Sequence, residues 1–176
     1  MIERLFWGGV TLLLVVCVLG VQTLRHGFFT VQPHEGALVL DYKGRVLREA
    51  NIGLNLRNPF LETVWTTEVT RWRTVRVEGL WSREACAVDG LVAWEIDNLV
   101  AYFGAQEALS VPRKISQVAS SVARGVSNPF DLEADAVGEW TVSYRNALRT
   151  HPELVQVGVV VKEAYPVQAP CAAFGY

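Results

Sequence analysis

The chain has few of the residues that carry chemistry in most enzymes and metalloproteins. Its 176 residues include three cysteines and three histidines, with no CxxC pair and no Cys/His spacing of the zinc-binding kind. No HExxH, GxSxG or phosphate-binding loop sequence is present either. We therefore expect no metal site, no cofactor and no catalytic residue, and a protein that is not an enzyme. The alternative is an enzyme, such as a hydrolase, that uses no familiar motif.

Charge is also scarce. Asp, Glu, Lys and Arg make up 19% of the chain, against about a quarter in an average protein, and the net charge is −2. Binding to nucleic acid needs a basic face, so this balance argues against a nucleic-acid partner. Hydrophobic residues make up 51% of the chain and six residues are tryptophan, which argues against long disordered stretches.

The hydrophobic excess lies mainly at the N-terminus. Residues 5–24 (LFWGGVTLLLVVCVLGVQTL) hold no charge, and a helix of that length spans a hydrocarbon core of about 30 Å. Trp7 lies near one end, where its ring favours the membrane interface. The alternative is a cleaved signal peptide, but the run is longer than a typical h-region and no small-x-small cleavage site follows. We expect residues 1–27 to form an uncleaved transmembrane anchor.

Strand patterns follow the anchor. Residues 37–42 (ALVLDY), the turn Lys43-Gly44 and residues 45–47 predict a hairpin. Residues 51–58 alternate apolar and polar side chains, and residues 60–65 predict an apolar loop.

Two longer strands are predicted next, and apolar and polar side chains alternate along the second. Residues 68–78 are rich in β-branched and aromatic side chains. Residues 85–96 predict a half-buried strand, with Asp89 and Glu95 on its solvated face.

The period then changes to that of helices. One apolar stripe, starting near Ser110, comprises Ile115, Val118, Val122 and Val126. A second helix is predicted from Asn128-Pro129, with the stripe Val137, Trp140, Tyr144 and Leu148. Residues 154–161 predict a last strand, and residues 166–176 an irregular tail. Strands grouped before helices favour an α+β fold, an antiparallel sheet with two helices, in one domain over residues 28–165.

Two groups of residues are candidates for contacts. The apolar group can dip into the bilayer interface or fill the domain's own core, and consists of Phe28, Phe29, Phe60, Leu61 and Trp65. The basic group can meet lipid phosphates or a neighbouring subunit, or form a plain exposed strand face, and consists of Arg71, Arg73 and Arg76. Whether Cys86 and Cys171 pair is left open, since a disulfide needs an oxidising compartment.

Five stretches, taken in order, resemble the SPFH (band 7) family, which includes stomatin, prohibitin, flotillin and the bacterial HflK/HflC pair. They are residues 31–36 (VQPHEG), 42–46 (YKGRV), 52–64 (IGLNLRNPFLETV), 88–97 (VDGLVAWEID) and 154–161 (LVQVGVVV). Two positions depart from the family: Ile52 stands where it usually has proline, and Asn55 where it often has histidine. Members of the family also have a long C-terminal coiled coil, and this sequence shows no heptad repeat that would form one.

The resemblance implies a non-enzymatic scaffold on a membrane. Such a protein assembles laterally, as a homo-oligomer or with other SPFH or membrane proteins, and encloses, organises or regulates them. It also implies membrane lipid as a partner, and a single-pass protein of the prokaryotic inner membrane with its domain outside the cytoplasm. The alternative is an accessory subunit of a larger membrane complex that forms no ring of its own. Because no coiled coil is expected, contacts should run through the domain, the anchor or a larger partner.

Overall fold

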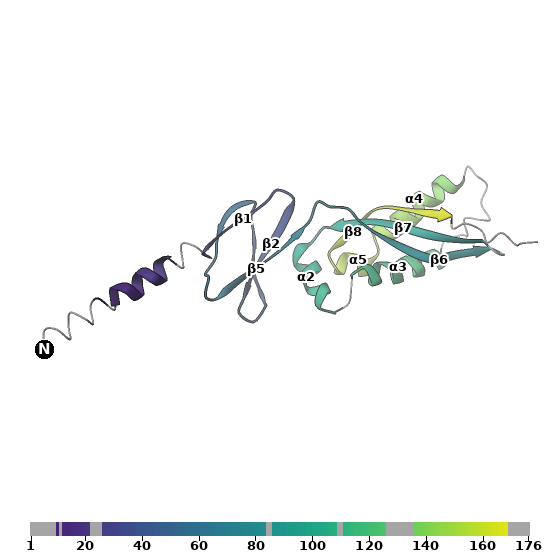
Figure 1. The fold of residues 1–176 in the computed structure, drawn as a ribbon. Coiled ribbons are helices and arrows are strands. Elements are labelled where there is room, and N and C mark those ends of the chain that lie inside the picture. The colour runs from purple at the N-terminus through teal and green to yellow at the C-terminus, as the bar shows by residue number, and fades with distance from the viewer. Residues whose placement is uncertain are drawn as a thin grey trace, which may run out of the picture. The chain divides into compact units, whose positions relative to one another are not determined.

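The computed structural model describes residues 10, 12–21, 26–83, 86–108, 111–125 and 136–168. The fold is α+β, with antiparallel sheets and several helices, as the sequence predicts. The chain divides into two compact units, residues 1–68 and residues 69–176 (Figure 1). This boundary falls inside the single domain expected over residues 28–165.

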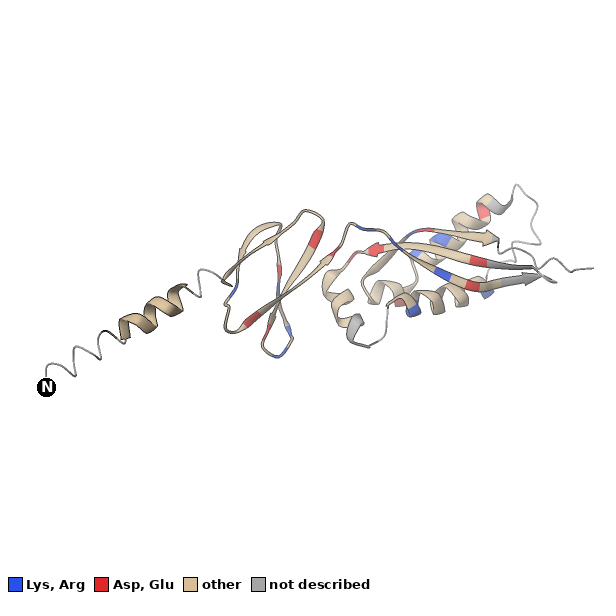
Figure 2. Cartoon of the chain, viewed as in Figure 1, with Lys and Arg blue, Asp and Glu red and all other residues tan. Residues whose placement is uncertain are grey.

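The N-terminal apolar segment is only partly described. Residues 12–21 are helical, exposed and without charge (Figure 2). Among the described residues, none of the helices combines the length and the apolarity that crossing a bilayer requires. The predicted anchor covers residues 1–27, and its residues 1–9, 11 and 22–25 lie outside the described part of the chain.

The described strands of the first unit form two small antiparallel sheets. They are β1 (Phe28–Val31), β2 (Glu35–Asp41), β3 (Val46–Ala50), β4 (Gly53–Leu56) and β5 (Glu62–Glu68). β1 pairs with β4, and the other sheet has the order β3-β2-β5. A buried cluster of Val31, Ala37, Val39 and Ala50 forms the core, with Phe29 and Val64 packed against it.

The predicted hairpin over residues 37–47 is confirmed, and one carboxylate holds its turn. Asp41 Oδ1 accepts hydrogen bonds from Lys43 N (2.8 Å) and Arg45 N (2.9 Å), and Asp41 Oδ2 pairs with Arg45 Nη2 at 2.7 Å. Gly44 adopts φ 78°, a left-handed conformation that glycine takes without strain. The hydrogen bond from Arg45 N is the largest of the contacts that lower the pKa of the Asp41 carboxyl.

The second unit is a three-stranded antiparallel sheet with helices packed on it (Figure 1). Its strands are β6 (Arg73–Arg83), β7 (Cys86–Ile96) and β8 (Val159–Gln168), in the order β6-β7-β8. Its described helices are α2 (Leu99–Ala108), α3 (Val111–Gly125), α4 (Ala136–Arg149) and α5 (Pro152–Gln156). α3 contacts β6, and α4 contacts β8.

Both predicted helix stripes reach the core of this unit. Ile115 and Val118 are buried on α3, and Trp140, Tyr144 and Leu148 are buried on α4. The hydroxyl of Tyr144 donates to Ala119 O at 3.2 Å, which links the two helices, and burial raises the pKa of this tyrosine. Val126, Val137 and the predicted start at Asn128-Pro129 lie outside the side chains that the structure describes.

Two predictions about the strands and loops are wrong. The apolar loop expected over residues 60–65 is mostly strand, because β5 begins at Glu62 and pairs with β2 along its whole length. The strand expected over residues 68–78 is interrupted, since β5 ends at Glu68 and β6 begins at Arg73. These errors share a cause: strand pairing partners, which the local pattern does not contain, decide where each strand starts and ends.

The C-terminal predictions and the helix count are also corrected. Residues 154–156, expected in a strand, belong to the short helix α5, which Pro152 starts from a first-turn position. β8 then runs from Val159 to Gln168, so the tail predicted to be irregular from residue 166 begins in a strand. α2 was not predicted, because its apolar residues follow no clear helical stripe.

Gly158 makes the turn from α5 into β8 possible, and its replacement tests that turn. It adopts φ 71°, and a Cβ there would lie 2.2 Å from Asn98 O and 2.8 Å from Tyr102 N. We expect Gly158→Ala to lower the free energy of unfolding by about 1–3 kcal/mol or more, from backbone strain and the clash. The measurement is denaturant unfolding of the full chain in mild detergent.

The matched control is Gly104→Ala on α2. A Cβ at Gly104 meets nothing within 4 Å, so alanine should be neutral or stabilising by up to about 1 kcal/mol. Equal stability of the two variants would contradict the proposed constraint at Gly158.

Candidate functional site

The β1–β4 sheet turns one apolar face outward. Its register pairs Phe28 with Leu56 and Thr30 with Leu54, and directly opposed residues share a face. The exposed fractions are 48% for Phe28, 57% for Leu56 and 72% for Leu54. Apolar side chains on adjacent strands thus lie together in solvent. Single exposed leucines are common on protein surfaces, but a group of adjacent apolar side chains is not.

The opposite face of the same sheet supplies the core. Val31 is almost fully buried, and Phe29 packs against the cluster that contains it. Because side chains alternate along a strand, burying Phe29 and Val31 places Phe28 on the other side. Of the two neighbouring phenylalanines that the sequence marks as contact candidates, Phe28 is therefore exposed and Phe29 is largely a core residue.

A turn between β4 and β5 carries two more exposed apolar side chains, Phe60 and Leu61, with exposed fractions of 61% and 57%. Asn58 Oδ1 accepts a hydrogen bond from Phe60 N at 3.0 Å, and Asn58 O accepts one from Glu62 N at 2.9 Å. These bonds define the turn and hold its tip outward. Below, the apolar surface means Phe28, Leu54, Leu56, Phe60 and Leu61.

Trp65, the fifth apolar candidate, does not belong to this surface. It lies in β5, half-buried, and its partner in the register with β2 is the buried Leu38. Leu54 and Leu56 were not predicted as contact residues, although the alternation over residues 51–58 was visible. The alternation shows that a strand has two different faces, but only the pairing with β1 shows which one faces outward.

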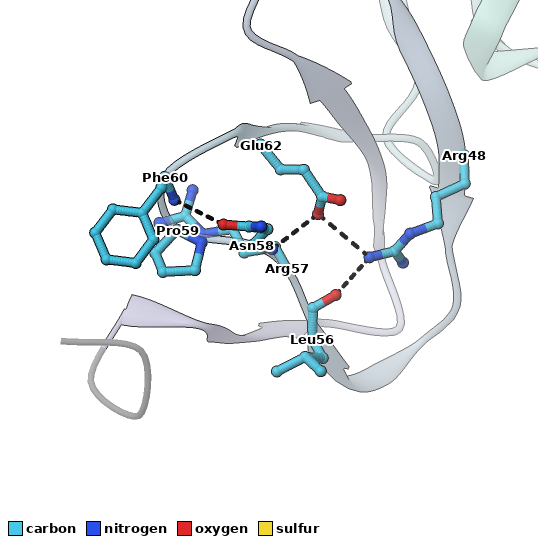
Figure 3. A pocket seen from close by; sticks show the side chains of 7 residues that line it. All are labelled: Arg48, Leu56, Arg57, Asn58, Pro59, Phe60 and Glu62. Atoms are coloured by element: carbon cyan, nitrogen blue, oxygen red, sulfur yellow. Dashed lines mark hydrogen bonds and ion pairs between the residues drawn. The ribbon is translucent and has the colours of Figure 1, made fainter. Parts of the chain in front are cut away.

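Next to the apolar surface lies an open pocket of about 410 Å³ (Figure 3). Its lining residues are Arg48, Leu56, Arg57, Asn58, Pro59, Phe60 and Glu62. The Nη2 of Arg48 donates to Leu56 O and lies 3.7 Å from Glu62 Oε2. The same carboxylate oxygen accepts a hydrogen bond from Asn58 N at 3.0 Å.

The three arginines marked as contact candidates do not form one cationic patch. Arg73 and Arg76 are three positions apart on β6, so their side chains leave opposite faces of the sheet. The guanidinium of Arg73 lies 5.3 Å from the centre of the buried Trp94 ring, a cation–π distance. Arg71 is exposed on the segment before β6. A role of these arginines in lipid or subunit contacts stays a prediction.

Arg76 belongs to an internal ion pair, and its partner corrects a prediction. Asp89, expected on a solvated strand face, is 5% exposed, and its Oδ2 lies 2.6 Å from Arg76 Nη2. Asp89 Oδ1 also accepts a hydrogen bond from Gly79 N at 2.8 Å, inside a bulge of β6. A bulge leaves backbone groups without ladder partners, and the Asp89 carboxylate accepts a hydrogen bond from one of them, Gly79 N. Glu95, expected on the same face, is partly exposed and pairs with Lys162 at 2.5 Å.

The remaining candidates form no reactive cluster in the part of the chain that the structure describes. Within the described ranges no group of three or more His, Cys, Asp or Glu side chains is placed to hold a metal ion. His34 and His26 are exposed. Cys17 is an exposed free thiol, whereas the Cys86 side chain and the whole of Cys171 lie outside the described part.

Comparison with known proteins adds no family assignment. No family model matches the chain, and no curated protein matches it.

The Asp89 contacts predict a pH dependence of stability. The hydrogen bond from Gly79 N, followed by that from Arg76, lowers the pKa of the Asp89 carboxyl from its ordinary value of 3.8. A carboxyl with a lowered pKa in the folded state stabilises the fold above its unfolded pKa, and this contribution disappears as the pH falls through the folded pKa. We expect Asp89→Asn to be less stable than wild type at neutral pH, with a difference that shrinks below about pH 4.

The measurement is denaturant unfolding across pH 2–7, with Asp97→Asn as control, since Asp97 is an exposed carboxyl just after β7. The control should follow the wild-type profile. A constant gap between Asp89→Asn and wild type over the whole range would refute the assigned role of the charge.

Proposed function

We propose that this protein is a single-pass membrane scaffold of the SPFH type. It assembles laterally on a membrane patch, as a homo-oligomer or together with other SPFH or membrane proteins, and encloses, organises or regulates those proteins. The observation that carries the proposal is the apolar surface, whose first residue, Phe28, follows the charge-free segment 5–24 after three residues.

The chemistry of the apolar surface supports contact with a bilayer. Fully burying one leucine or phenylalanine side chain is worth about 1.5–3 kcal/mol, so five partly exposed ones represent a substantial unused driving force. Soluble monomers seldom leave such a patch in water. A membrane interface next to the N-terminal apolar segment would cover it and hold the first unit against the bilayer.

The placement of the resembling stretches supports the family part of the proposal. Residues 31–36 form the turn from β1 into β2, residues 42–46 form the β2–β3 turn, and residues 52–64 run from β4 through the Phe60 turn into β5. All three therefore shape the unit that bears the apolar surface. Residues 88–96 lie in β7, the central strand of the second unit, and Asp97 follows it directly.

Anchoring each chain in the membrane favours lateral assembly. Chains held in one plane meet at a high effective concentration, so weak side-by-side contacts suffice to hold them together. A closed ring of identical chains needs two different, complementary patches on each copy.

Self-assembly is tested on the full chain, expressed alone and extracted in mild detergent. Light scattering combined with particle imaging should show a discrete particle of many copies. A monomer or dimer would exclude a self-assembled ring and would favour the accessory-subunit alternative, for which co-purification from the native membrane is the direct test.

Membrane contact is tested separately by a polarity-sensitive fluorophore. It is attached at Leu54→Cys in a full chain whose native cysteines are replaced by serine, and the protein is placed in lipid nanodiscs. We expect blue-shifted emission and quenching by brominated lipid, because the bilayer covers this side chain. The control is Glu49→Cys, an exposed position on β3 of the same unit. Equal, water-like emission at both positions would show that the apolar surface does not touch lipid.

A further inference from the structure

Hydrogen bonds hold one wall of the pocket beside the apolar surface, and among the described residues one positive charge of its lining has no carboxylate partner. Arg48 and Glu62 form the wall (Figure 3): Arg48 bonds Leu56 O, and Glu62 takes the hydrogen bond from Asn58 N. The negative charge of Glu62 thus has a cation and a backbone donor beside it, and the Glu62 side chain is 22% exposed. An entering anion therefore meets a neutralised carboxylate rather than a bare one.

Arg57 supplies the second positive charge. Its backbone N donates to Gly27 O at 2.7 Å and its Nε donates to His26 O at 3.1 Å, so the start of β1 positions this side chain. Within the described residues no carboxylate pairs with its guanidinium, whose Nη groups keep donors to spare. Arg48, Arg57 and Glu62 together give the pocket a net positive charge.

The same pocket is apolar on another side. Leu56 and Phe60 line it and also belong to the apolar surface. A ligand that satisfies both parts carries an anionic group next to a hydrocarbon chain. Free phosphate would engage the guanidinium alone and leave Leu56 and Phe60 in water.

We propose that this pocket binds the phosphodiester headgroup of an anionic phospholipid, with the Arg57 guanidinium as the main ligand and Leu56 and Phe60 against the glycerol and the start of the acyl chains. Arginine is suited to this role because its planar fork of donors matches phosphate oxygens. The inference rests on the proposed membrane contact and adds a lipid selectivity to it. A zwitterionic lipid carries the same phosphate, but its ammonium group would sit beside a pocket that is already positive.

The test is native mass spectrometry of the full chain in mild detergent, titrated with phosphatidylglycerol, with phosphatidylcholine or with glycerol phosphate. We expect wild type to retain phosphatidylglycerol in preference to phosphatidylcholine and to retain no glycerol phosphate. Arg57→Gln should weaken retention of phosphatidylglycerol about fivefold, the effect of one basic side chain close to an anionic headgroup. The control, Lys43→Gln, removes one charge from the β2–β3 turn of the same unit and should change nothing.

A third variant separates charge from structure. Arg57→Lys keeps the positive charge but loses the guanidinium Nε that bonds His26 O. Retention in Arg57→Lys that lies between wild type and Arg57→Gln supports the headgroup contact, because lysine keeps the charge and loses the fork of donors. Equal loss in both variants would mean that Arg57 only anchors the start of β1, and would overturn the inference. So would equal retention of the two lipids by wild type, or retention of glycerol phosphate as strong as that of the lipid.

Light scattering on the same samples separates this inference from the scaffold proposal. Assembled particles without lipid selectivity would overturn the headgroup site and leave the scaffold intact. Selective lipid binding by a monomer would support the headgroup site and overturn the self-assembled scaffold.

Discussion

The antiparallel pairing of β1 with β4 is the constraint on which the first unit depends. With Phe28 opposite Leu56 and Thr30 opposite Leu54, the strand period of two sends Phe29 and Val31 inward and leaves Phe28, Leu54 and Leu56 outside. A slip of β1 by one residue would turn Phe28 inward and Phe29 and Val31 outward, at the expense of the core. The core therefore fixes the register, and the register places the apolar surface. The backbone bond from Arg57 N to Gly27 O extends the pairing and brings Arg57 to the pocket.

Buried carboxylates stabilise irregular backbone in both units. Asp41 accepts two backbone N–H bonds in the β2–β3 turn, and Asp89 accepts one from Gly79 in the bulge of β6. Each also pairs with an arginine, Arg45 or Arg76, that is itself more than half exposed. The arginine stays in contact with water, while the carboxylate accepts the backbone hydrogen bonds. Because only one partner is buried, the pair has a lower desolvation cost than a fully buried ion pair.

The arginines of this chain therefore have different roles that residue type alone does not separate. Arg76 neutralises an internal carboxylate, Arg73 stacks over a buried tryptophan, and Arg48 bridges a carbonyl and a carboxylate. Arg57 combines a structural bond through Nε with a charge that faces an open pocket. A cluster of arginines close in sequence, such as residues 71–76, is thus a weak guide to a single binding surface.

The sequence by itself determined the class of fold, the β2–β3 hairpin, the alternating strand β7 and the inward faces of α3 and α4, because these depend on local turn chemistry and on periodicity. It also drew attention to Phe28, Phe60 and Leu61. Only the tertiary structure decided the limits of β5 and β6, the burial of Asp89, and the separation of Phe28 from Phe29, because each depends on a partner distant in sequence. Leu54 and Arg57 entered the candidate site for the same reason: the pairing of β4 with β1, and not any pattern along the chain, sets the direction in which their side chains point.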